Sequence, residues 1–107
     1  MKYIMFLAEA RGLQVLIPVI FPKNLVHKFV ATCMEPCIKA HGYFTVIPIR
    51  AGDVSIFGTD ITCSGKSDTL NLKSDPNDAS IIHNYDYSHG MNCDFIEEAI
   101  KKAKESK

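Results

Sequence analysis

Hydrophobic residues in the first half of the chain form extended runs separated by short polar turns, a pattern typical of β-hairpins. Residues 2–8 and 13–21 are both largely apolar, and the polar loop between them contains Gly12. Apolar side chains at 3–7 occupy both faces of the expected strand, which suits a central strand covered on both sides or one covered by a partner subunit. A second pair of runs surrounds 51–53 and predicts another hairpin. The expected strands are 2–8, 13–21, 43–50, 54–58 and 69–72.

Two of these expected strands contain a proline, Pro18 in one and Pro48 in the other. Proline has no N–H to donate to a neighbouring strand, so within a sheet it is confined to edge strands and bulges. We therefore expect an edge or a bulge at both positions.

A helix is predicted from Leu25 to Met34, where apolar residues recur at helical spacing. Asn24 is placed to cap its N-terminus, because the side-chain oxygen of asparagine accepts a hydrogen bond from an unpaired backbone N–H. Pro36 is expected to end the helix, since proline disfavours helical geometry in the residue before it. The expected apolar face comprises Leu25, Val26, Phe29, Val30, Cys33 and Met34, opposite His27, Lys28 and Glu35.

The clearest helix start in the chain is Asp75-Pro76-Asn77-Asp78. The first aspartate can cap the helix, proline suits the first helical position, and the second carboxylate favours the positive end of the helix dipole. Residues 85–107 are expected to form a loop followed by a C-terminal helix. The apolar stripe of that last helix comprises Phe95, Ile96, Ala99, Ile100 and Ala103.

Together these elements predict the order β-β-α-β-β-β-α-α. The fold class is then α+β, with a mostly antiparallel sheet of about five strands and helices on one face. A chain of 107 residues is expected to be a single domain, with its core in 1–84 and a peripheral segment at 85–107. Apolar residues make up 47% of the sequence, which supplies a core and argues against wholesale disorder.

The charge balance and the apolar runs narrow the range of partners. Twelve Lys and Arg residues face twelve Asp and Glu residues, so the formal charge is zero. Nucleic-acid-binding proteins usually carry a basic excess, and a nucleic-acid-binding accessory protein is kept only as an alternative. The apolar run 3–8 is too short for a signal-peptide core, and no run approaches the roughly 20 residues that span a bilayer. We expect a cytoplasmic protein with reduced thiols and no membrane partner.

Cys33, Cys37 and His41 follow a spacing that could begin a zinc site. Zinc normally takes four convergent nitrogen or sulfur ligands. Cys33 also lies on the expected apolar face of a helix, where a free cysteine behaves as a small buried hydrophobe. We therefore expect no cofactor, and keep a metal- or thiol-dependent protein that uses these three residues as an alternative.

The run Ser64-Gly65-Lys66-Ser67 contains the G-K-S ending of a phosphate-binding loop. That motif also needs a glycine where this chain has Asp60, and a helix directly after the loop. A strand is expected there instead, so the pattern favours an ordinary turn. No G-x-S-x-G motif occurs either, and we expect a protein without enzymatic activity.

The stretch 63–79 has the most distinctive pattern in the chain, because it combines a polar turn, an alternating strand and a helix start. If the leucines at 70 and 72 face the core, the polar side chains around them point outward. The following loop carries tyrosines, which are enriched at protein interfaces. The expected interaction surface comprises Lys66, Asp68, Thr69, Asn71, Lys73, Tyr85 and Tyr87.

The same stretch carries a resemblance. Residues 64–79, with the pattern S-G-x-S-x-x-L-x-L-K-S-x-P-x-D-A after an apolar hairpin and a helix, resemble small uncharacterised proteins carried by bacteriophages and prophages. The resemblance covers 1–84 in the order of elements, and the segment from 86 onward lies outside it. It implies no catalytic residues. It does imply a phage accessory protein that acts by binding, a class that includes inhibitors of host defence.

The two-sided apolarity of 3–7 and 15–21 exceeds what one or two helices readily cover. An uncovered apolar face in a small protein favours pairing with a second copy. We therefore expect a homodimer that binds a further protein partner in the host cytoplasm.

Overall fold

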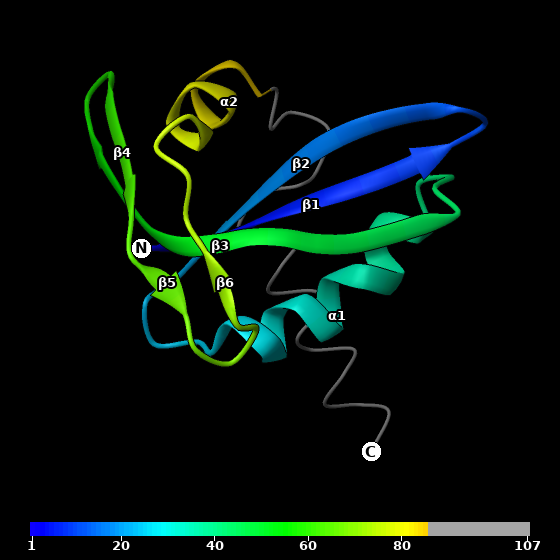
Figure 1. The fold of residues 1–107 in the computed structure, drawn as a ribbon, viewed down its shortest axis with the longest axis horizontal. Helices are drawn as coiled ribbons and strands as arrows, with labels where there is room; N and C mark the ends of the chain where they lie inside the picture. The colour runs from blue at the N-terminus through cyan, green and yellow to red at the C-terminus, as the bar shows by residue number, and fades with distance from the viewer. Residues whose placement is uncertain (86–107) are drawn as a thin grey trace.

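The protein's computed structural model describes residues 1–85. Its centre is an antiparallel sheet of four strands in the order β2-β1-β3-β4, accompanied by a two-stranded sheet and two helices (Figure 1). This arrangement confirms the α+β class and the mostly antiparallel pairing. The four strands are β1 (Lys2–Ala10), β2 (Leu13–Phe21), β3 (Thr45–Phe57) and β4 (Asp60–Ser64).

The first hairpin confirms the expected role of its proline. β1 pairs with β2 around a turn at Arg11 and Gly12, and Pro18 lies opposite Met5 on β2, the last strand of the sheet order. β1 is the strand between β2 and β3, so neighbours flank it on both sides. The side chains of residues 3–6 are fully buried, as two-sided apolarity predicts for a central strand.

The hairpin predicted around 51–53 is wrong, because β3 continues through these residues as one strand. Gly52 has no left-handed φ and pairs with Tyr3 within the sheet. The register with β1 shifts near Pro48, between the pairs Met5–Arg50 and Phe6–Pro48, which is the expected bulge. The reversal occurs instead at Gly58 and Thr59, where a φ of 59° at the glycine permits a tight turn into β4.

The strand predicted at 69–72 is also displaced. A small sheet is formed by β5 (Lys66–Ser67) and β6 (Leu72–Lys73), and the residues between them make a turn in which Asn71 has a φ of 54°. Within this turn, the Leu70 N–H donates to Ser67 Oγ. Leu70 in the turn and Leu72 in β6 both pack against the core.

Helix α1 (His27–Lys39) begins later and ends later than expected. Its N-cap residue is Val26, which has no side-chain cap, so the predicted capping by Asn24 is wrong. Pro36 lies within the helix. It is on the exposed side, where the carbonyl that loses its hydrogen bond can reach water.

The buried face of α1 is rotated relative to the prediction. His27 is buried, because its Nε2 donates to the carbonyl of Gly52 at 2.9 Å and its ring packs edge-on against Phe21. Val26 and Phe29, which were expected on the apolar face, are exposed. The buried residues of the helix are His27, Val30, Ala31, Cys33, Met34 and Ile38.

Helix α2 (Asp78–Asn84) starts three residues after the predicted cap. Asp75 Oδ1 accepts a hydrogen bond from the backbone N–H of Asn77, which makes a turn that leads into the helix. Asp78 lies in the first turn of α2, as expected, and its side chain is completely buried.

The two helices cover opposite faces of the sheet, which corrects the expectation that both lie on one face (Figure 1). Ile4 and Phe6 of β1 belong to the hydrophobic cluster that includes α1. Tyr3 and Met5 belong to a second cluster that includes Ile82 of α2. The apolarity of both faces of β1 is therefore explained within one chain. The predicted C-terminal helix lies outside the described residues.

Candidate functional site

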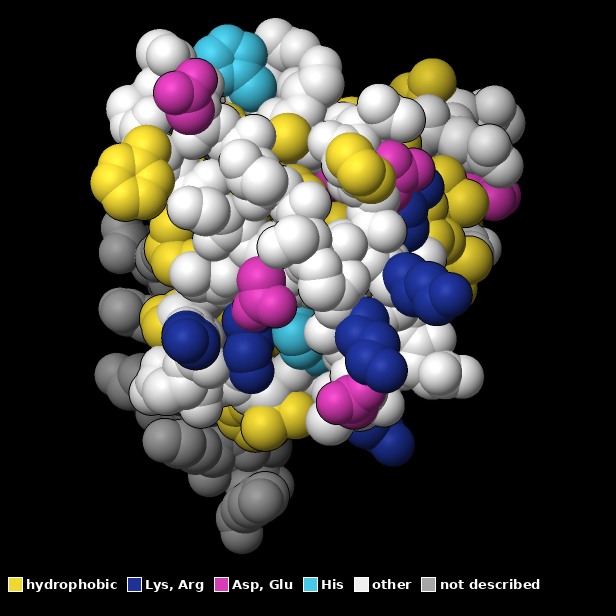
Figure 2. All heavy atoms as spheres, turned by 60° about the vertical axis from the view of Figure 1, so that its left-hand side comes forward, with side chains coloured by type: hydrophobic (Ala, Val, Ile, Leu, Met, Phe, Trp, Pro, Cys, Tyr) yellow, Lys and Arg dark blue, Asp and Glu magenta, His cyan; other side chains and the backbone are white. Residues whose placement is uncertain are grey.

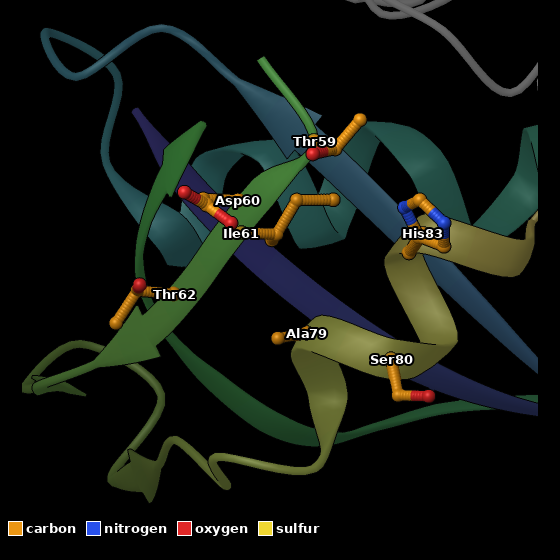
Figure 3. Close-up of a pocket in the computed structure, with 7 residues that line it drawn as sticks. All are labelled: Thr59, Asp60, Ile61, Thr62, Ala79, Ser80 and His83. Atoms are coloured by element: carbon orange, nitrogen blue, oxygen red, sulfur yellow. The ribbon is translucent and has the colours of Figure 1, made fainter. Parts of the chain in front are cut away.

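A groove of about 520 Å³ lies between strand β4 and helix α2 (Figure 3). Ile61 projects from the strand toward the helix, and Ala79 projects from the helix toward the strand. Asp60 and Thr62 point to the other side of β4, so the strand also contributes its backbone to the wall. The lining residues are Thr59, Asp60, Ile61, Thr62, Ala79, Ser80 and His83.

Two exposed hydrophobic side chains adjoin this groove at the tip of the β3–β4 hairpin. Phe57 is 79% exposed and Ile56 is 41% exposed. Phe57 pairs with Asp60 and Ile56 pairs with Ile61, so both are directly beside groove residues. A monomer gains nothing from a phenyl ring held in water, which makes this tip a candidate contact surface.

The helical side of the groove is anchored to the sheet through Asp78, the first residue of α2. The Tyr3 hydroxyl donates to Asp78 Oδ2 at 2.7 Å, and Arg50 Nε and Nη2 both lie 2.8 Å from Oδ1. The backbone N–H of Asp75 donates to the same tyrosine oxygen at 3.3 Å. This buried network connects α2 to both β1 and β3, so the helix is held in place across from β4.

The groove contains the residue types of a hydrolytic site but not their arrangement. Nucleophilic catalysis requires a base within hydrogen-bond reach of a hydroxyl and a third group that orients the base. In the described part of the chain, no hydrogen bond joins the side chains of Ser80, His83 and Asp60.

Cys63 lies beside the buried network and is held as a thiol. Burial first, and then the charge of Asp78, raise the pKa of this thiol to about 11, although a hydrogen bond with Tyr3 acts in the other direction. Burial is also the main cause that raises the pKa of the Tyr3 hydroxyl, followed by its hydrogen bond to Asp78. Because the thiolate is the nucleophilic form, Cys63 is unsuited to thiol chemistry near neutral pH.

The raised pKa of Cys63 predicts a loss of stability in alkali. The folded protein retains the thiol proton up to about pH 11, whereas the ordinary value is 9.0. The contribution is therefore fully present below pH 9 and is lost as the pH rises toward 11. We expect the free energy of unfolding, measured with urea at several pH values, to fall across this interval. Cys63→Ala should make that fall shallower, and an unchanged slope would contradict the assignment.

The candidate metal residues do not form a ligand set. Cys33 is buried against the core, and its thiol pKa is raised by burial and by the neighbouring Cys37. Cys37 is partly buried on the same helix, and His41 follows the helix end. Within residues 1–85, no group of three or more His, Cys, Asp or Glu residues could hold a metal ion.

The predicted polar interaction residues lie on the surface around the β5–β6 turn. Lys66, Asp68, Asn71 and Lys73 are exposed. Thr69 is exposed as well, but its Oγ1 accepts a hydrogen bond from the Lys28 N–H and so caps α1 from a distant segment. Figure 2 brings the β4 and β5 side of the molecule forward and shows positive and negative side chains interspersed there. The surface is therefore mixed in charge.

The two tyrosines of the predicted surface have different outcomes. Tyr85 is partly buried and packs against the cluster that includes α1. Tyr87 lies outside the described residues. A ring that is partly occupied by its own core has less surface to offer a partner.

Sequence reasoning missed the groove because it placed the second hairpin at the wrong turn. With the reversal expected at 51–53, Phe57 lies inside the expected strand 54–58 and not at the tip of a hairpin. The available signal was Gly58-Thr59 between Ile56-Phe57 and Asp60-Ile61, since glycine at the first position of a two-residue turn is a recognised hairpin pattern.

No helix within residues 1–85 is long and apolar enough to cross a membrane. A scan against protein-family models finds no matching family, and searches of curated proteins and of solved structures find no matching protein.

Proposed function

We propose that this protein is a small non-enzymatic binding protein that recognises a protein partner with the β4–α2 groove and the adjoining hairpin tip. The observation that carries the proposal is the exposed pair Ile56 and Phe57 beside a groove of about 520 Å³. Interface energy concentrates in a few apolar or aromatic anchors that are desolvated by the partner. An exposed phenyl ring next to a concave surface has the geometry of such an anchor.

The buried network around Asp78 supports this function through rigidity. A surface that already has its bound shape loses less conformational freedom when a partner docks. Because Asp78 is held by both Tyr3 and Arg50, α2 keeps its position relative to β4 without a partner. The groove is therefore preorganised.

The resemblance of 64–79 to small phage and prophage proteins supports a host protein as the partner. In this proposal the protein acts in the host cytoplasm, and binding inhibits a host factor such as a defence protein. The mixed surface charge and the zero net charge of the chain suit a protein partner better than a nucleic acid.

Phe57→Ser tests the proposal. We expect it to weaken binding of a partner captured from host lysate by about tenfold or more, because it removes the central apolar anchor. The dissociation constant can be measured by isothermal titration calorimetry with the purified partner. Phe29→Ser is the matched control, since Phe29 is also an exposed phenylalanine (39%) but lies on α1, which covers the opposite face of the sheet from α2. If both variants weaken partner binding equally, or if neither variant weakens it, the proposed surface is contradicted.

The proposed homodimer rests on a different surface. Because α1 and α2 cover both faces of the sheet, the apolarity of β1 does not support a dimer. Three hydrophobic side chains near the β1–β2 turn are exposed instead: Leu13, Phe44 and Ile47. Phe44 donates its N–H to Glu9, and Leu13 pairs with Ala10, so the two flank the end of β1. We expect multi-angle light scattering to show a dimer that Phe44→Ser dissociates. A monomer at working concentration would contradict it.

A further inference from the structure

The edges of the sheet differ in how they are protected against pairing with another strand. Native proteins blunt exposed edges with proline, bulges or lysine. β2 carries Pro18. The part of β3 that does not pair with β4, residues 45–52, carries Pro48 and a bulge. β4 runs Asp60-Ile61-Thr62-Cys63-Ser64, with no proline, no lysine and a regular register.

β4 also has an edge available for pairing. It is the last strand in the sheet order and pairs with β3 on one side only, so among the described strands none occupies its other edge. In an antiparallel pair every second residue directs its N–H and C=O away from the partner strand. The outer edge of β4 therefore presents backbone donors and acceptors in register.

The groove lies along this strand. Four consecutive residues from Thr59 to Thr62 line it, and α2 forms the opposite wall with Ala79, Ser80 and His83. A groove between an edge strand and a helix can accept an extended peptide, whose backbone pairs with the strand while alternate side chains enter the pocket. A bound helix could not satisfy the edge groups of β4 in this way.

We propose that the partner inserts an extended segment that pairs with β4 as an additional strand. This inference rests on the proposed function and names the kind of segment that the site takes. An aliphatic side chain of the segment lies between Ile61 and Ala79, and a Lys or Arg close to it in sequence contacts Asp60. Asp60 points to the opposite side of β4 from Ile61, and neighbouring side chains of an extended segment also point to opposite sides. A basic residue next to the aliphatic one would therefore lie on the side of Asp60, the one carboxylate among the described lining residues, which include no Lys or Arg.

A library of random twelve-residue peptides displayed on phage, selected against the full chain, tests this inference. We expect the enriched peptides to share an aliphatic residue with a basic neighbour. In an extended peptide, only every second backbone amide faces the edge strand. We therefore expect N-methylation of the selected peptide at one set of alternate amides to weaken binding by about tenfold or more, because those amides donate to β4. Methylation in the other register should have a small effect.

A matched pair of variants tests the charge. Asp60→Asn should weaken the selected peptides several-fold, whereas Asp68→Asn, which changes an exposed carboxylate on the β5–β6 turn, should leave their affinity unchanged. Amide chemical shifts of β4 and α2 should move on binding. No enrichment over the empty matrix, or equal tolerance of methylation in both registers, would overturn the inference. If the inference is overturned in this way but Phe57→Ser still releases the natural partner, the proposed function stands without the added strand.

Discussion

Asp78→Ala is expected to lower the free energy of unfolding by about 3–5 kcal/mol, the usual cost of removing one member of a buried ion pair. Asp78 is fully buried, and its carboxylate accepts from both Arg50 and Tyr3. The side chain of Arg50 is 27% exposed, so the variant leaves a largely buried guanidinium without its anion. Urea denaturation followed by circular dichroism measures the change.

Two control variants separate the buried pair from a general effect of losing a carboxylate. Asp60→Ala removes an exposed carboxylate and should change stability by no more than about 0.5 kcal/mol. Tyr3→Phe removes one hydrogen bond to the buried carboxylate and the acceptor of the Asp75 N–H but leaves the Arg50–Asp78 pair, and about 1–2 kcal/mol is expected. If Asp78→Ala costs no more than Asp60→Ala, the network does not hold α2 against the sheet, and the rigidity argument for the groove fails with it.

The first hairpin could be predicted from the sequence because its signals are local. Two apolar runs surround a short turn with Gly12, and the absence of an N–H in Pro18 restricts that strand to an edge. The bulge beside Pro48 follows from the same property. Each inference needs only the chemistry of one residue and its neighbours, and each is confirmed.

Helix α1 was predicted less well because distant residues position it. Asn24 was the local candidate for a cap, but the Lys28 N–H donates to Thr69, which is 41 residues away. Periodicity places His27 on the polar face, yet its ring is buried because it donates a hydrogen bond to the Gly52 carbonyl. A periodicity argument treats histidine as polar and has no knowledge of a partner in another strand.

The helix start at Asp75–Asp78 illustrates how a correct local explanation can hide a long-range role. Carboxylates near a helix N-terminus are favourable on electrostatic grounds alone, so the local pattern needs no other partner to explain it. In the structure Asp78 is paired with Tyr3, 75 residues earlier, and with Arg50. The element that forms one wall of the groove is thus fixed by contacts that only the fold brings together.

Gly52→Ala should be the most disruptive small substitution in the sheet. A Cβ at this position would lie 2.5 Å from the carbonyl oxygen of Ser64 and 2.9 Å from the Cβ of Ser74. The first of these is a backbone atom at the end of β4, so no side-chain rotation relieves the overlap. Overpacking of this kind typically costs about 1–3 kcal/mol, and we expect the upper part of that range in urea denaturation.

Gly12→Ala is the informative control, because it separates crowding from backbone strain. Gly12 has a φ of 80° with no atom within 4 Å of an added Cβ, so its variant has conformational strain without a clash. Gly52 has the reverse combination and supports two elements at once, since its carbonyl accepts from His27 of α1 while its Cα faces the end of β4. We therefore expect Gly52→Ala to lose more stability than Gly12→Ala and, in addition, to weaken partner binding at the groove. If the two variants are equal in stability and both bind normally, the close packing of Gly52 against Ser64 does not position β4.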